Sequence, residues 1–86
     1  MPLISSFYGI KILMYPFDHL PKHFHNKYTD FEATMDIETS KISQGFLPGK
    51  AEKLVKEWVL KHKEELLSNW EILSKGKKPE KIKPLW

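Results

Sequence analysis

The residues best suited to chemistry are grouped in one short segment, Asp18-His19-Leu20-Pro21-Lys22-His23-Phe24-His25. It holds three of the chain's 4 histidines, beside an aspartate and a proline. Imidazole is the side chain that titrates, binds metals and transfers protons near neutral pH. This segment is therefore the first place to look for a functional site.

From His23 onward the pattern of residues predicts two paired strands, 23–28 and 31–38, joined by a tight turn at Thr29-Asp30. This register pairs His23 with Asp36, His25 with Thr34, and Lys27 with Glu32. Opposed Cβ atoms lie about 4.5–5.5 Å apart, so a carboxylate is expected beside His23. The same register places apolar side chains together on the opposite, helix-facing side: Phe24, Ala33, Met35 and Ile37.

One role for the histidines is metal binding. His19, His23 and His25 could bind a divalent metal such as zinc or manganese, with Asp18 as an alternative ligand. Three protein ligands would leave a coordination position for catalysis, and Asp36 could orient His23.

Two other roles are open from the residues. In one, His23, His25 and Asp36 form a catalytic group that acts as acid and base toward a phosphodiester, with Lys27 or Lys11 stabilising charge. In the other, the histidines are purely structural and hydrogen-bond to loop backbone and to Asp36. The sequence does not decide among the three.

The surrounding pattern switches once, from short strand-like runs to one long helical run, which predicts an α+β domain. Phe7–Tyr15 is expected to form a first strand and Lys41–Phe46 a fourth. The predicted fold is a three- to four-stranded antiparallel β-meander followed by one long C-terminal α-helix packed on one face.

The helix is predicted over Lys50–Ser74, with Gly49 as N-cap, Glu52 in the first turn and Gly76 directly after the end. A helix of this length would be roughly 35 Å long, whereas strands of this size span about 17–20 Å. It must therefore bend near residues 61–63, overhang the sheet, or bury its second half against the tail or another subunit.

Composition narrows the class of protein. The 86 residues predict a single domain over 1–74 and a basic Lys/Pro-rich tail over 75–86. There is no cysteine for disulfides or thiolate zinc sites. The absence of arginine argues against sequence-specific nucleic-acid recognition. No signal peptide or membrane span is evident, so we expect a cytoplasmic protein without membrane contact.

Several motifs together resemble the small prokaryotic proteins grouped as the domain of unknown function four-one-six-zero. They are Phe7-Tyr8-Gly9-Ile10, Asp18-His19-x-Pro21-x-His23-Phe24-His25, Asp36-Ile37-Glu38-Thr39, Leu47-Pro48, Glu57-Trp58, His62-Lys63-Glu64-Glu65-Leu66 and Asn69-Trp70. The chain departs from the family's usual pattern at Lys22, where proline is common, and at Lys63, where arginine is common. The resemblance implies no activity. It does imply a gene often placed beside that of a second small protein, in a toxin–antitoxin-like module.

These observations lead to two functional hypotheses. The first is a partner-binding protein that recognises the product of an adjacent gene, or a second copy of itself, through Trp58, Asn69 and Trp70. Its exposed lysines would give weak attraction to RNA: Lys75, Lys77, Lys78, Lys81 and Lys83. The second is an enzyme, either a metal-dependent hydrolase or a ribonuclease, centred on His19, His23 and His25.

Overall fold

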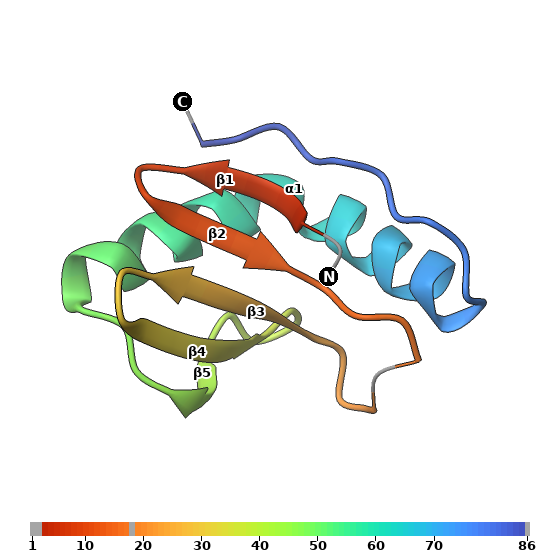
Figure 1. Cartoon of the computed structure of the whole chain (residues 1–86), viewed down its shortest axis with the longest axis horizontal. Coiled ribbons are helices and arrows are strands. Elements are labelled where there is room, and N and C mark those ends of the chain that lie inside the picture. Colours follow the sequence, from red (N-terminus) through yellow and green to blue (C-terminus); the bar gives the residue numbers. More distant parts are fainter. Residues whose placement is uncertain (1–2, 18, 86) are drawn as a thin grey trace.

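The computed structural model describes residues 3–17 and 19–85 and shows one antiparallel sheet with one helix across it (Figure 1). The strands follow one another in chain order across the sheet, β1-β2-β3-β4-β5. The elements are β1 (Leu3–Phe7), β2 (Ile10–Leu13), β3 (His23–Tyr28), β4 (Phe31–Asp36), β5 (Ile42–Gly45) and α1 (Gly49–Ser74). The α+β meander followed by a long helix is confirmed, with one strand more than expected.

The additional strand arises because the predicted first strand, Phe7–Tyr15, is wrong. Phe7 ends β1, Tyr8 and Gly9 make a turn, and the chain returns as β2. Both turn residues have positive φ, 49° for Tyr8 and 79° for Gly9, as a two-residue type I′ hairpin turn requires. Tyrosine is an unusual residue for that conformation, so the local sequence did not signal the turn.

The second hairpin has the predicted register. Tyr28 pairs with Phe31, and the ladder continues to His23 opposite Asp36. Four side chains on the helix-facing side are buried, as expected: Phe24, Ala33, Met35 and Ile37. β4 ends at Asp36, two residues earlier than predicted.

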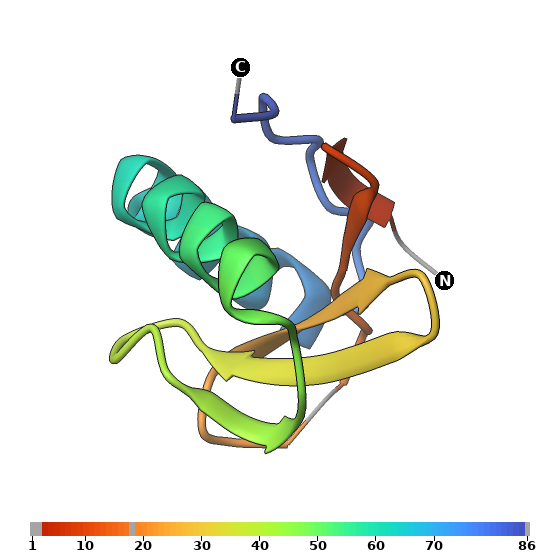
Figure 2. The same cartoon turned by 90° about the vertical axis from the view of Figure 1, so that its left-hand side faces the viewer.

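Helix α1 covers one face of the sheet (Figure 2). Trp58 is part of the buried core that α1 forms with the sheet. Its indole centroid is 5.4 Å from the ring of Phe7 on β1 and 6.1 Å from that of Phe24 on β3. The side chain is completely buried. One aromatic residue thereby joins the helix to two strands of the sheet.

The helix ends differ in how well the sequence predicted them. The N-cap is Pro48 rather than Gly49, and the Glu52 amide donates to the Pro48 carbonyl at 2.9 Å. Gly76 follows the helix with φ +73°, as predicted. The amides of Gly76 and Lys77 donate to the carbonyls of Leu73 and Ile72, which is the Schellman arrangement.

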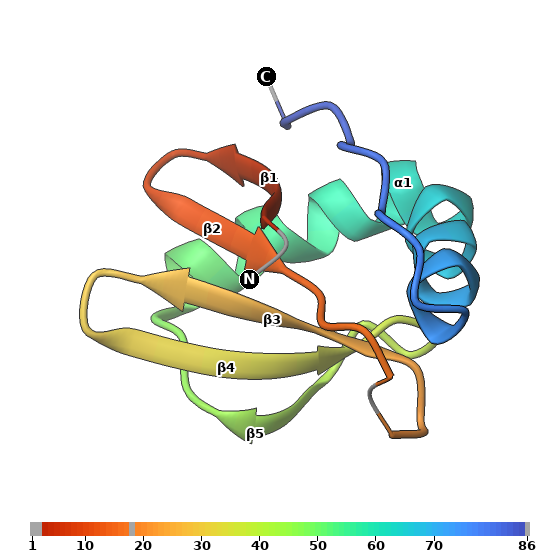
Figure 3. The same ribbon diagram turned by 45° about the vertical axis from the view of Figure 1, so that its right-hand side comes forward.

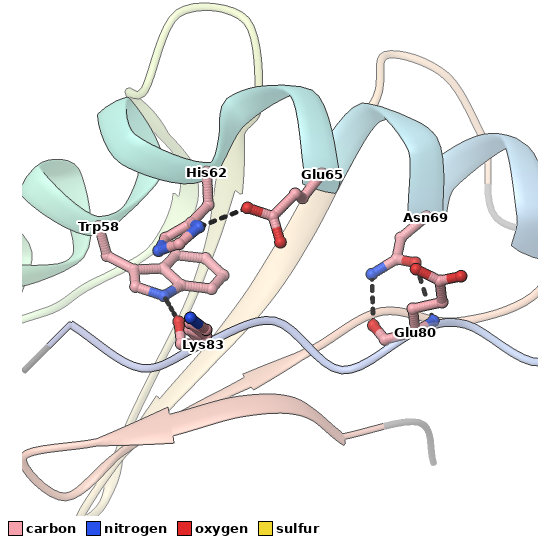
Figure 4. A network of polar contacts seen from close by, with 6 residues as sticks. All are labelled: Trp58, His62, Glu65, Asn69, Glu80 and Lys83. Atoms are coloured by element: carbon pink, nitrogen blue, oxygen red, sulfur yellow. Dashed lines mark hydrogen bonds and ion pairs between the residues drawn. The ribbon is translucent and has the colours of Figure 1, made fainter.

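Helix α1 bends at His62, within the segment 61–63 that was one of the three alternatives for a helix of this length. His62 has non-helical backbone angles, φ −126° and ψ 22°, within the predicted 61–63 segment. The half-buried imidazole of His62 bonds through Nδ1 to Oε1 of Glu65 at 2.6 Å and lies beside the Trp58 ring (Figure 4). Among the described residues, no helix has both the length and the apolar character needed to cross a bilayer.

The segment after α1 packs back along the molecule, between α1 and the outer edge of β1 (Figures 1 and 3). The Ile82 amide donates to the Ile4 carbonyl at 3.0 Å, and Nε1 of Trp58 donates to the Lys83 carbonyl at 2.8 Å. The Asn69 side chain both donates to the Glu80 carbonyl, at 2.8 Å, and accepts from the Glu80 amide, at 3.0 Å (Figure 4). The tail therefore covers the helix and part of an otherwise open sheet edge. Trp86 lies outside the described residues.

Substituting Trp58 by phenylalanine should release the tail. W58F removes the bond to Lys83 as well as ring volume, whereas W70F removes ring volume alone. We expect W58F to lose about 1 kcal/mol more unfolding free energy than W70F in urea titrations, the usual net contribution of one hydrogen bond. Hydrogen exchange at the Ile82 amide should accelerate in W58F only. Equal losses for the two variants would show that the tail bond contributes nothing.

Candidate functional site

The histidine segment forms a row of rings at one end of the sheet. Centroids are 5.1 Å apart between His19 and His23, 5.1 Å between His23 and His25, and 4.7 Å between His25 and Tyr15. His19 belongs to the loop between β2 and β3, the other two histidines to β3, and Tyr15 follows β2. The structure therefore brings the three predicted histidines together and adds Tyr15, which the sequence did not single out.

His23 lies at the buried centre of this row. It is only 4% exposed, and its ring centroid is 5.2 Å from that of Trp70 on α1. Nδ1 lies 2.7 Å from the Pro21 carbonyl oxygen. A carbonyl can only accept, so Nδ1 carries the hydrogen and donates, which leaves Nε2 as the atom that could take a proton or a metal. His23 thus fixes the β2–β3 loop against both β3 and the helix.

His25 occupies the more accessible position. It is half-buried and lines a shallow hollow of about 320 Å³ on the sheet face that α1 does not cover. Its Nδ1 lies 3.4 Å from Oγ1 of Thr34, and Tyr15, Lys27 and Glu32 line the same hollow. An imidazole, a phenol and an ammonium group therefore face one small space.

Two lysines meet beside this hollow. Lys11 on β2 is directly opposite Lys27 on β3, a like-charged pair that weakens strand pairing. The Glu32 carboxylate lies 3.3 Å from the Lys27 ammonium group. The predicted charge-stabilising groups, Lys11 and Lys27, are thus on the same face as His25.

Asp36 lies directly across from His23, as the register predicted. Its Oδ1 also accepts from the amides of Glu38 and Thr39, at 2.9 and 3.4 Å. These bonds stabilise the turn after β4, a local role common for aspartate. The predicted catalytic carboxylate is therefore also a structural part of this turn.

The predicted metal site needs converging nitrogen ligands at about 2.0–2.1 Å from zinc. Within residues 3–17 and 19–85, no three His, Asp or Glu side chains are grouped so that they could hold one ion. Zinc or manganese binding by His19, His23 and His25 stays a prediction. The alternative ligand, Asp18, lies outside the described residues.

The residues expected to contact a partner are all inside the molecule. Trp58, Asn69 and Trp70 are buried among the sheet, the helix and the tail. The exposed apolar side chains lie elsewhere, and two of them, Phe17 and Leu20, belong to the β2–β3 loop. Sequence reasoning missed these two because it treated the loop as a carrier of histidines. The signal was two large apolar residues between Pro16 and Pro21.

Residues 9–71 match the family model described as Domain of unknown function (DUF4160). The chain belongs to this family. The match covers the whole histidine segment, β2 to β5 and most of α1, but neither β1 nor the tail. No curated protein and no solved structure matches the chain.

Lys22 and Lys63, the two lysines noted above as departures from the family resemblance, each take part in a contact between α1 and a loop. Lys22 lies 3.6 Å from the carboxylate of Glu71, and Lys63 donates to the Glu38 carbonyl at 2.9 Å. Each contact joins the second half of α1 to the loops at the end of the sheet. Each contact has one acceptor, so a lysine ammonium group can make it and the two-pronged guanidinium of an arginine is not required.

The different burial of His23 and His25 predicts different losses of unfolding free energy when each is replaced by alanine. H23A should lose about 2–3 kcal/mol of unfolding free energy, because it removes a packed ring and the bond to Pro21. H25A, from a half-buried position, should lose under about 1 kcal/mol. Urea titration followed by tryptophan fluorescence measures both. An equal loss in the two variants would contradict the assignment of His23 as the structural member of the pair.

Proposed function

We propose that this protein is the partner-binding component of a two-gene, toxin–antitoxin-like module and that it binds its partner through the β2–β3 loop. The observation that carries the proposal is the exposure of two large apolar side chains on that loop. Phe17 is 74% exposed and Leu20 72% exposed. Exposed aromatic residues held on a fixed scaffold are frequent anchors of protein interfaces.

The loop backbone supports this proposal because Phe17 is held in a costly conformation. Its φ is +58°, in the left-handed region, which costs a residue with a bulky side chain roughly 1–2 kcal/mol. Its amide donates to the Leu73 carbonyl at 3.4 Å. A side chain built on Gly76 would come within 2.7 Å of the Phe17 ring, so this glycine provides the space in which the ring lies.

Strained residues of this kind occur preferentially at recognition sites, where the surrounding structure fixes them. Phe17 and Leu20 are therefore presented in a preorganised loop, which lowers the entropic cost of binding. The gene arrangement implied by the family resemblance supplies the candidate partner, the product of the adjacent gene. Association of two copies of this chain is the other outcome that the same surface permits.

Two substitutions in the loop should separate binding from stability. L20D should weaken association with the adjacent gene product at least tenfold, because it places a charge in an apolar contact. F17N should also weaken association but should not lower stability, since asparagine tolerates the left-handed conformation. Calorimetric titration measures the first effect and urea titration the second.

The matched control is L60D, because Leu60 is 76% exposed on α1. This variant should bind like the unmodified protein. The proposal would fail if L20D and L60D bound equally well, or if gel filtration showed a monomer that ignores the adjacent gene product.

A second candidate function is phosphodiester hydrolysis, as a ribonuclease or a metal-dependent hydrolase. It is favoured by one specific observation, the hollow in which His25 faces Tyr15 and Lys27. His25 could exchange a proton with a ribose hydroxyl or a leaving group, and Lys27 could stabilise the charge that develops on the phosphate. The tail lysines are all exposed and would add salt-sensitive attraction to RNA: Lys75, Lys77, Lys78, Lys81 and Lys83.

This second candidate predicts RNA cleavage that depends on His25. H25A should lower the cleavage rate at least about a hundredfold, the usual contribution of a general acid or base, while the fold is retained. The matched control is H62A, which removes a histidine that does not line the hollow. Elemental analysis of tag-free protein should be run in parallel, since the metal-dependent version requires bound zinc or manganese. Unchanged cleavage in H25A would exclude the hollow as the active site.

A further inference from the structure

A large depression lies between the first residues of the tail, the start of β1 and the β2–β3 loop. It has a volume of about 920 Å³. Its apolar lining combines Leu3 from β1, Tyr15 and Pro16 from the β2–β3 loop, and Leu73 from the last turn of α1. Phe17, next to Pro16 in the chain, lies against Gly76 at the border of this groove. The groove therefore continues the apolar surface of the partner-binding loop.

The tail side of the groove is basic. Lys77, Lys78 and Lys81 line it, and all three are exposed. The acidic residue between them in sequence, Glu80, does not line the groove but a smaller pocket next to Asn69, which Lys81 also lines. Among the described residues, those that line the groove include three lysines and no acidic residue. The groove joins an apolar floor to one wall of positive charge.

The basic wall is held in place before any ligand arrives. At its start, the Lys77 amide donates to the Ile72 carbonyl at 3.1 Å. In its middle, Asn69 exchanges two hydrogen bonds with the backbone of Glu80, and just beyond it the Ile82 amide donates to Ile4. A wall fixed at three points loses little backbone entropy on binding, which favours affinity.

These features favour a peptide over a nucleic acid. Proteins that bind single-stranded RNA present aromatic faces on which bases stack. Leu3, Leu73 and Pro16 provide aliphatic surface instead, and Tyr15 is already packed edge-on against His25. An aliphatic floor with a lysine rim matches an acidic polypeptide segment that carries a large apolar side chain.

We infer that this groove binds an acidic segment of the partner protein, with an apolar side chain of that segment on the floor and its carboxylates beside Lys77, Lys78 and Lys81. The inference rests on the proposed partner-binding function and specifies the chemistry of the partner. The basic wall and β1 lie outside residues 9–71, the range that matches the family model. The groove is thus built largely by segments that the family model does not describe.

The first test uses a pool of short, fluorescein-labelled acidic peptides, each with one central tryptophan or leucine. Fluorescence anisotropy should show binding that weakens as salt rises, because exposed charge pairs are screened. Replacing the central residue by alanine should weaken binding about tenfold, as expected for an apolar anchor. In amide-resolved NMR spectra, the shifts that change should include those of Leu3, Gly76 and Lys77. Binding that ignores the central residue, or shift changes confined to other surfaces, would overturn the inference.

The second test reverses charge at the groove wall. The double variant K78E/K81E should bind the acidic peptides about tenfold more weakly. The double variant K53E/K61E is the matched control, since it changes the same net charge at two exposed positions of α1. A single-stranded oligonucleotide should compete poorly; competition as strong as that of the peptides would assign the groove to RNA and overturn the inference.

Binding measurements with the adjacent gene product distinguish failure of this inference from failure of the proposed function. If that protein binds, depends on Leu20 and binds K78E/K81E as well as the control variant, the partner-binding function stands and the groove assignment is overturned. If it fails to bind at all while the acidic peptides still bind in the groove, the module partner is overturned and the ligand class of the groove is supported.

Discussion

The whole structure depends on the burial of one indole. Trp58 fills the space between α1 and the sheet, where it meets Phe7 on β1 and Phe24 on β3. Its single polar atom, Nε1, needs an acceptor once the ring is buried, and the Lys83 carbonyl provides it. The bond from this one aromatic residue, together with those of Asn69 and Ile82, holds the tail on its path. That path then forms a wall of the groove and covers the edge of β1.

The sequence predicted those parts of the fold that follow from a regular period. The register of β3 and β4 followed from alternation, because a slip of one residue would have exposed Phe24 and Met35. The bend of α1 at His62 was one of three alternatives that the comparison of helix and strand lengths left open. The β1–β2 turn was missed because Tyr8 occupies a left-handed position usually held by glycine or asparagine. Phe7, the last residue of β1, packs against Trp58. These two residues are far apart in sequence, so no local pattern contains this contact.

The candidate site was predicted in part. Alternation placed His23 and His25 on one face, and the structure brings their rings into contact. Alternation did not reveal that Trp70 on α1 lies against His23, with the ring centroids 5.2 Å apart. The two histidines therefore have different surroundings despite sharing a strand face. Which side chains of the β2–β3 loop are exposed depends on the Phe17 contact with Leu73, which no local pattern contains.

The row of rings from Tyr15 to His19 has one more consequence, for communication between surfaces. It begins at the hollow and ends in the loop that carries Leu20. A molecule that turned the His25 ring would press on His23, whose bond to Pro21 holds that loop. If binding in the hollow changed the affinity of the Leu20 surface in this way, binding at Leu20 would change the affinity of the hollow by the same factor, because linkage is reciprocal. The hollow beside His25 and the loop that carries Leu20 would then influence each other's binding affinity.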